Sequence, residues 1–137
     1  MGFEKSLILS AAGMKAQGDR LRVIAENLAN KNSAPDTPGG DPYQRRIVTF
    51  KNVLDREMDM NVVKVDRIRK DETDFPLKYD PTHPGANEDG YVKMPNVNPL
   101  IEMADMRDAN RSYQANLQVL KQARDLISMT IDLMRAR

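Results

Sequence analysis

Residues 99–135 read PLIEMADMRDANRSYQANLQVLKQARDLISMTIDLMR, and this stretch decides the fold. Its apolar residues recur at alternating intervals of three and four, which is the a/d repeat of a coiled-coil seam. Asn98 and Pro99 are typical of a helix start, because Asn can cap free backbone N–H groups and Pro suits the first turn. Glu102 adds a favourable negative charge near that positive helix end. The pattern predicts one helix about 55 Å long, at a rise of ~1.5 Å per residue.

The predicted seam of this C-terminal helix is apolar except at Asn110 and Arg124. A polar residue at such a position usually fixes register or partner number at a cost in stability. Arg124 can equally lie at a partly exposed helix edge, with its long stem along apolar surface. The seam consists of Met103, Met106, Asn110, Tyr113, Leu117, Leu120, Arg124, Ile127, Ile131 and Met134.

A second heptad repeat lies at the other end of the chain and ends at the stop signals of residues 30–35. Large and small residues alternate along it, and small residues let a neighbouring helix approach closely. We therefore expect dense packing against this N-terminal helix. Its seam consists of Leu7, Ala11, Met14, Gly18, Leu21, Ala25 and Leu28.

The segment between the two repeats is rich in proline and glycine, so turns dominate it. Short β-prone stretches at residues 47–50, 62–65 and 75–79 predict two or three strands. The sequence therefore predicts a mainly α fold, in which long N- and C-terminal helices with coiled-coil heptads flank a small insert of strands and loops. The expected parts are an assembly helix over 1–34, a loop-rich insert over 35–97 and a second assembly helix over 98–137.

Composition limits the classes of function. The chain has 137 residues, of which 40% are hydrophobic, and its mean hydropathy is −0.62. Apolar surface for a core of its own is therefore limited, and a partner could supply the missing burial. A net charge of +1 offers no field that would attract nucleic acid or an anionic membrane. No run of about 20 apolar residues and no cleavable secretory signal are evident, so membrane insertion is not expected.

Motifs that carry chemistry are weak. The chain contains no cysteine, which excludes disulfides, thiolate metal sites and cysteine nucleophiles. His83 is the single histidine and could act with Asp80 as a base or metal ligand, but a metal site needs more convergent ligands. The acidic residues between 71 and 90 lack the spacing of an EF-hand, and no phosphate-binding loop is present. The sequence thus predicts no catalytic residues, no cofactor and no metal site.

Three stretches resemble a known family, namely residues 17–30, 90–98 and 102–116. The first ends in the Asn-Leu-Ala-Asn box that closes the N-terminal helix of flagellar rod and hook proteins. Together with the short insert and the Asp-Pro-Thr-His-Pro sequence at 80–84, they make the chain similar to flagellar basal-body rod proteins over essentially its whole length. Within that family the resemblance is to the short proximal-rod members. The motif residues are Asn27, Leu28, Ala29, Asn30, Asn96, Val97, Asn98, Glu102, Met103, Arg111, Tyr113, Ala115 and Asn116.

The resemblance implies a structural subunit of the bacterial flagellar rod that polymerises through its terminal helices and transmits torque. It implies copies of the chain, other rod subunits and the flagellar type III export apparatus as partners. It also implies a place in the periplasmic part of the basal body, reached by export without a cleaved signal peptide.

Two other classes of protein remain as alternatives. A generic coiled-coil adaptor or a needle-type subunit of another type III secretion system would suit the helices, although the Asn-Leu-Ala-Asn and Tyr-Gln-Ala-Asn boxes disfavour both. A metal-dependent hydrolase built on Asp80 and His83 is a third class, and it would retain a stoichiometric metal ion.

Overall fold

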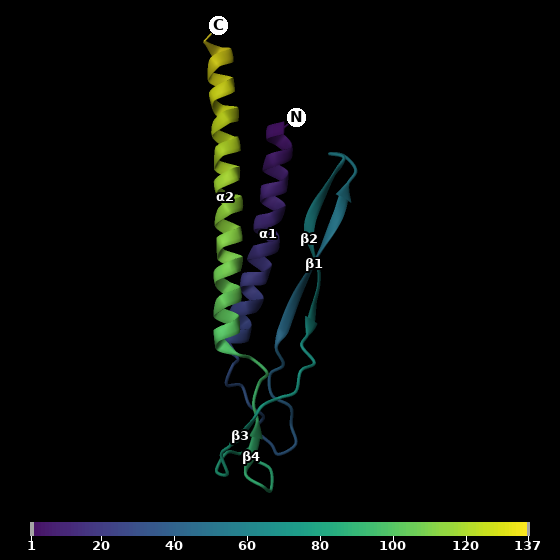
Figure 1. Ribbon diagram of the computed structural model, residues 1–137, viewed down its shortest axis with the longest axis vertical. Helices are drawn as coiled ribbons and strands as arrows, with labels where there is room; N and C mark the ends of the chain where they lie inside the picture. The colour runs from purple at the N-terminus through teal and green to yellow at the C-terminus, as the bar shows by residue number, and fades with distance from the viewer. Residues whose placement is uncertain (1, 137) are drawn as a thin grey trace. The chain divides into compact units, whose positions relative to one another are not determined.

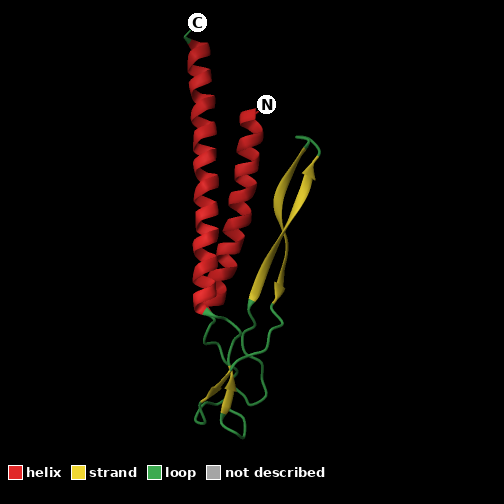
Figure 2. Ribbon diagram, viewed as in Figure 1, coloured by secondary structure: helices red, strands yellow, loops and turns green. Residues whose placement is uncertain are grey.

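The computed structural model describes residues 2–136, which form two helices and four strands (Figures 1 and 2). The described chain divides into two compact units, and each is made of segments that are far apart in sequence. The first unit contains residues 2–21, 49–67 and 107–136, and the second contains residues 22–48 and 68–106. The elements are α1 Gly2–Ala29, β1 Arg46–Asp55, β2 Met60–Lys70, β3 Leu77–Tyr79, β4 Tyr91–Lys93 and α2 Pro99–Arg135.

The predicted mainly α fold with coiled-coil flanks is wrong. Helix accounts for 48% of the chain and strand for 20%, and the strands form two separate two-stranded antiparallel sheets. Strands β1 and β2 are 10 and 11 residues long, well beyond the short strands that the sequence pattern indicated. Their β-branched residues favour a strand, and pairing within a long hairpin extends that conformation into the charged residues on either side. The fold is therefore mixed α and β.

Within the single chain, the buried residues of each helix lie beside the predicted seam and not on it. None of the seven seam residues of α1 is buried; the residues that are buried precede seam positions by one or two. One residue corresponds to a rotation of about 100° round a helix. Apart from Val23 and Ile24, the residues at the buried positions are small or polar. The buried positions are Ser10, Gly13, Ala16, Val23, Ile24 and Asn27 in α1, and Glu102, Ala109 and Ala123 in α2.

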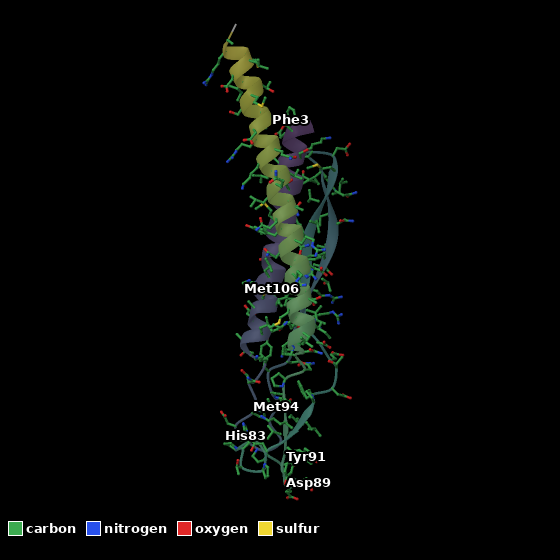
Figure 3. The ribbon with its side chains drawn as sticks, turned by 60° about the vertical axis from the view of Figure 1, so that its left-hand side comes forward. Phe3, His83, Asp89, Tyr91, Met94 and Met106 are labelled. Carbon is green, nitrogen blue, oxygen red and sulfur yellow. The ribbon has the colours of Figure 1, made fainter. Side chains whose placement is uncertain are left out.

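In the first unit, α1 and α2 approach closely at Gly13. A Cβ atom on Gly13 would lie 2.7 Å from Nδ2 of Asn116, which is too close for any other residue without a shift. Large apolar side chains remain at the surface of this unit: Phe3, labelled in Figure 3, exposes 43% of its surface and Leu133 exposes 71%. No helix in the described range 2–136 combines the length and hydropathy that a membrane span requires.

The second unit contains the end of α1, the start of α2 and the small sheet of β3 and β4. These two strands pair antiparallel, with Leu77 opposite Lys93 and Tyr79 opposite Tyr91. Val92 lies on the buried face of this sheet and exposes only 1% of its surface. Val23 and Ile24 of α1 are also buried in this unit, and beside them lie two buried polar side chains, Asn27 and Glu102, which belong to the candidate site.

Candidate functional site

A cluster of polar side chains occupies the interior of the second unit. We call it the polar cluster and define it by five residues from five segments: Asn27, Arg45, Asp71, Asn96 and Glu102. They come from the last turns of α1, the residue before β1, the residue after β2, the loop after β4 and the first turn of α2. Asn27 and Glu102 expose only 1% and 0% of their surfaces. Five chain segments therefore meet through polar groups that water does not reach freely.

Arg45 is bound by three carboxylates. Its Nε donates to Oε1 of Glu102, and a terminal nitrogen donates to Oδ2 of Asp71 at 3.0 Å. The other terminal nitrogen lies 3.5 Å from Oδ2 of Asp105. Burial on its own would lower the pKa of Arg45, but the hydrogen bonds to Glu102 and Asp71 outweigh it and raise that pKa above its ordinary value. The planar guanidinium is thus held as a charged fork between α2 and the end of β2.

Asn27 binds the backbone at the start of β1 as a paired strand would. Its amide nitrogen donates to the carbonyl of Arg46 at 2.9 Å and to Oε2 of Glu102 at 3.2 Å. Its oxygen accepts from the Arg46 N–H at 3.0 Å and from the Tyr43 hydroxyl at 2.7 Å. Both donors and both acceptor positions of the amide are therefore used. Only an amide side chain of this length supplies two donors and two acceptor positions at one point.

The hydroxyl of Tyr43 is affected by the same surroundings. Burial raises the pKa of Tyr43, the charge of Arg46 opposes that rise, and the carboxylates of Glu26 and Glu102 add to it. The net result is a pKa above the ordinary value of 10.0. Tyr43 therefore stays a neutral hydrogen-bond donor to Asn27 at physiological pH.

Asn96 connects the segments before β1 and after β2. Its oxygen accepts from the Arg45 N–H at 2.7 Å, and its amide nitrogen donates to the carbonyls of Asp71 at 2.9 Å and Thr73 at 3.1 Å. Burial would raise the pKa of Asp71, but the Thr73 N–H and the Arg45 guanidinium outweigh it and hold that pKa below its ordinary value of 3.8. Asp71 is consequently ionised at neutral pH and pairs with Arg45 as a charged carboxylate.

The polar cluster uses its hydrogen-bonding capacity inside the chain. Among residues 2–136, no buried side-chain nitrogen or oxygen lacks a partner. Such a network fixes one arrangement of the segments that it joins, because any displaced group would be left buried and unpaired. The polar cluster therefore joins four parts of the fold: the end of α1, the start of α2, the start of β1 and the end of β2.

His83 and Asp80 lie in a turn of the second unit, where Figure 3 labels His83. The His83 Nδ1 accepts a hydrogen bond from the Gly85 N–H at 2.9 Å, and the Thr82 hydroxyl donates to Asp80 at 3.0 Å. Over the described residues, no three side chains of the metal-binding types come together. Both residues thus hold the turn in its conformation.

The structure separates the motif residues of the sequence into three groups. Asn27, Asn96 and Glu102 meet in the polar cluster. Asn98 caps α2, since its oxygen accepts from the Leu100 N–H at 3.1 Å. Asn30 donates to the Glu26 carbonyl at 2.8 Å, where α1 ends, and Asn116 lies against Gly13. The remainder lie at exposed or half-buried positions: Leu28, Ala29, Val97, Met103, Arg111, Tyr113 and Ala115.

Arg45 and Asp71 are central to the polar cluster, and the sequence analysis did not select either. They are separated by 26 residues from each other, and Arg45 is 57 residues from Glu102, so no local spacing connects them. No signal in the sequence marked them, because the residues directly beside Arg45 and Asp71 belong to parts of β1 and β2 that lie outside the predicted strands.

The seam residues are available at the surface of the single chain. None of those in α2 is buried, and Met103, Ile131 and Met134 expose 56%, 44% and 72% of their surfaces. The side chain of Arg124 is 70% exposed, which agrees with its interpretation as a helix-edge residue. The large apolar side chains of the two seams thus remain uncovered or half covered within one chain.

Long terminal helices with uncovered apolar residues, joined by an internal polar cluster, define a structural subunit of an assembly. Residues 88–133 match the sequence model of a family described as flagellar basal body rod FlgEFG protein C-terminal. That match covers Asn96 and Glu102 of the polar cluster. The class of protein to which this chain is similar is therefore that of flagellar rod proteins.

Curated relatives specify the family. The chain is 54% identical over 128 residues to the flagellar basal-body rod protein FlgC of Agrobacterium fabrum, and the match covers 93% of this chain and 92% of that protein. FlgC of Bacillus subtilis is 36% identical over 143 residues, with 93% and 95% covered. FlgC of Salmonella typhimurium is 37% identical over 125 residues, with 91% and 92% covered. The chain belongs to the FlgC family of flagellar basal-body rod proteins, which confirms the resemblance seen in its motifs. It is a structural subunit of the rod.

Proposed function

We propose that this rod subunit polymerises through the apolar seams of α1 and α2, with copies of itself and other rod subunits as partners. The observation that carries the proposal is the mismatch between the seams and the buried side of each helix. The seams hold large apolar residues such as Leu117 and Met134, yet none of them is buried in the single chain. Large apolar side chains that recur along one side of a helix and stay uncovered are typical of a protein–protein interface.

Torque transmission follows from such packing. Long helices that pack side by side share load through many small dispersion contacts and resist sliding by interdigitation. In the same proposal, the polar cluster keeps the start of α2 and the end of α1 in a fixed arrangement within each subunit. Load that enters through a helix then reaches the hairpin and loops without a change of conformation.

The remaining features of the proposal come from the family. Relatives are named as basal-body rod proteins, and a periplasmic place reached through the flagellar type III export apparatus would suit that role. The proposal assigns the chain no enzymatic activity. A coiled-coil adaptor or a needle-type subunit is not favoured, because the relatives described above are all flagellar rod proteins.

Leu117→Asp tests the seams. Leu117 is a half-buried seam residue in α2, so an assembled interface would bury the introduced carboxylate without an evident partner. An unpaired buried charge costs several kcal/mol, which lowers an association constant by orders of magnitude. We expect the variant to be expressed, to keep the helix content of the wild type, and to be absent from purified basal bodies.

Gln118→Asp is the matched control. Gln118 is exposed and lies one position round the helix, so its new charge can remain in water. It should copurify with basal bodies at the wild-type amount. Equal incorporation of the two variants would show that this seam is not an assembly surface.

A further inference from the structure

The small sheet of β3 and β4 has an apolar outer face. Leu77, Tyr79 and Tyr91 share that face and expose 61%, 65% and 42% of their surfaces. An antiparallel sheet with one buried face normally carries polar residues on the other. We call Leu77, Tyr79 and Tyr91 the outer patch; Lys93 lies on the same face, opposite Leu77. Figure 3 labels Tyr91 beside Asp89 at this end of the second unit.

The two rings of the outer patch are held in place before any partner binds. Their centroids are 5.3 Å apart and their planes meet at 64°, an edge-to-face pair. Gly90 has a φ of 85°, and a Cβ at this position would lie 3.0 Å from Cε2 of Tyr79. Glycine thus permits both the turn and the contact between backbone and ring. Exposed aromatic side chains that are already ordered lose little entropy on binding and are typical of interface hot spots.

A second uncovered apolar surface lies on α2. Its residues are spaced by seven, three and four positions and expose between 45% and 71% of their surfaces. They lie roughly 140° round the helix from the predicted seam, so packing through the seam leaves them uncovered. Asp125 and Asp132 border them on one side. We call this set the outer stripe, and it consists of Val119, Leu126, Met129 and Leu133.

We propose that the outer patch of one copy binds the outer stripe of a second copy. The surfaces are complementary: ordered aromatic rings meet aliphatic and thioether side chains, and Met sulfur makes favourable contacts with aromatic rings. Lys93 on the patch would face Asp125 or Asp132 beside the stripe. Lys93 lies 3.6 Å from Asp41 within its own chain, but that ion pair is exposed and is easily exchanged.

The contact is head-to-tail, because it joins two different surfaces of identical chains. Contacts of this kind continue from copy to copy and build rings or open helical assemblies. The inference rests on the proposed function, since it requires copies to lie next to one another in the rod. It adds a contact through the small sheet to the packing of the helices through their seams.

Cysteine crosslinking tests the contact in assembled rods, because the chain has no cysteine of its own. Tyr79→Cys and Met129→Cys are placed in separate copies that are expressed together, and purified basal bodies are treated with a short bismaleimide. We expect a covalent dimer that forms only when both variants are present. The matched control pairs Tyr79→Cys with Lys121→Cys, which is exposed, lies outside the outer stripe and is eight residues, about 12 Å, from Met129 along α2. The dimer should be several-fold more abundant with Met129→Cys than with Lys121→Cys.

The outcomes separate this inference from the proposed function. If the variants are incorporated but the 79–129 dimer is no more abundant than the 79–121 control, the proposed contact is wrong. Assembly through the seams would not be affected by that result. If the cysteine variants do not incorporate, wild-type basal bodies are treated instead with a carbodiimide, which joins a lysine to a carboxylate without a spacer. A peptide that links Lys93 to Asp125 or Asp132, recovered from a species of two chain masses, would support the contact. Its absence from that species would overturn it.

Discussion

The polar cluster and the distal half of α2 differ in how their side chains meet water: the first buries and pairs polar groups, and the second exposes apolar ones. In the cluster, Asn27 and Glu102 are almost inaccessible to water, and every hydrogen-bonding position of Asn27 is used. In distal α2, Leu133 and Met134 expose 71% and 72% of their surfaces. The polar groups of one region are paired within the chain, whereas the other region leaves large apolar side chains exposed to water.

The difference shows how one small chain can both fold and assemble. Charged hydrogen bonds are directional, so the polar cluster specifies one arrangement of five segments. Apolar burial is non-directional and scales with area, so the helices gain stability from any neighbour of suitable shape. The proposed function thus describes a subunit with a fixed centre and with helices that are stabilised chiefly by assembly.

The largest expected effect comes from breaking the polar cluster at its most buried residue. Glu102→Ala leaves the Arg45 guanidinium without its main carboxylate and removes the partner of the Asn27 amide. Removing one partner of a buried ion pair costs about 3–5 kcal/mol of unfolding free energy. Urea denaturation of the purified subunit measures it.

Met103→Ala is the control for that substitution. Met103 is the next residue along α2 and exposes 56% of its surface, so its truncation should change the unfolding free energy by about 0.5 kcal/mol or less. Similar losses for the two variants would contradict the importance assigned to the polar cluster.

A smaller effect is expected where the helices meet in the first unit. Gly13→Ala places a Cβ 2.7 Å from Asn116 Nδ2, and overpacking of this kind costs about 1–3 kcal/mol. Gly18→Ala meets nothing within 4 Å and should instead stabilise the helix by up to about 1 kcal/mol. Thermal unfolding of both variants followed by circular dichroism gives the comparison. If the double variant Gly13→Ala, Asn116→Ala recovers the lost stability, the clash lies between these two residues. If it does not, the contact with Asn116 is not the cause of the loss.

The smallest effect concerns pH. The pKa of Asp71 is lowered in the folded chain, so the unfolded state binds more protons at acidic pH and stability falls with falling pH. The contribution of Asp71 is fully present well above 3.8, its ordinary pKa, and is lost as pH falls through the lower folded value. Asp71→Asn should therefore cost about 1 kcal/mol at pH 7, and this cost should shrink at pH values below 3.8. A cost that does not change with pH would argue against an ionised Asp71 as the cause.

The sequence identified features that depend on local chemistry. The Asn98–Pro99 signal indicated the start of α2, and the cap is present because it needs only neighbouring residues. The residues of each helix that are buried within the single chain were not predicted, because Gly13 and Ala109 look like poor core residues until two elements approach closely. β4 is three residues long and depends on its pairing with β3, so no local pattern predicted it.

The polar cluster was only partly accessible from the sequence. Asn27, Asn96 and Glu102 were selected by resemblance to a family, and not by any pattern that revealed their contacts. Arg45 and Asp71 join them through tertiary contacts across long separations. Such contacts are decided by the path of the chain in space, and an isolated charge beside a strand is usually a solvated one.

Hydrogen exchange on the dilute purified subunit tests the central claim most directly, because it reports the stability of each region separately. The account predicts slow exchange for the amides of Arg45 and Arg46, which donate to Asn96 and Asn27 in the polar cluster. It predicts fast exchange over residues 126–134, which are exposed or half-buried and therefore have few tertiary contacts to stabilise the helix. Slow exchange across 126–134 in the monomer, or fast exchange at Arg45 and Arg46, would contradict the division between a self-sufficient centre and helices that depend on assembly.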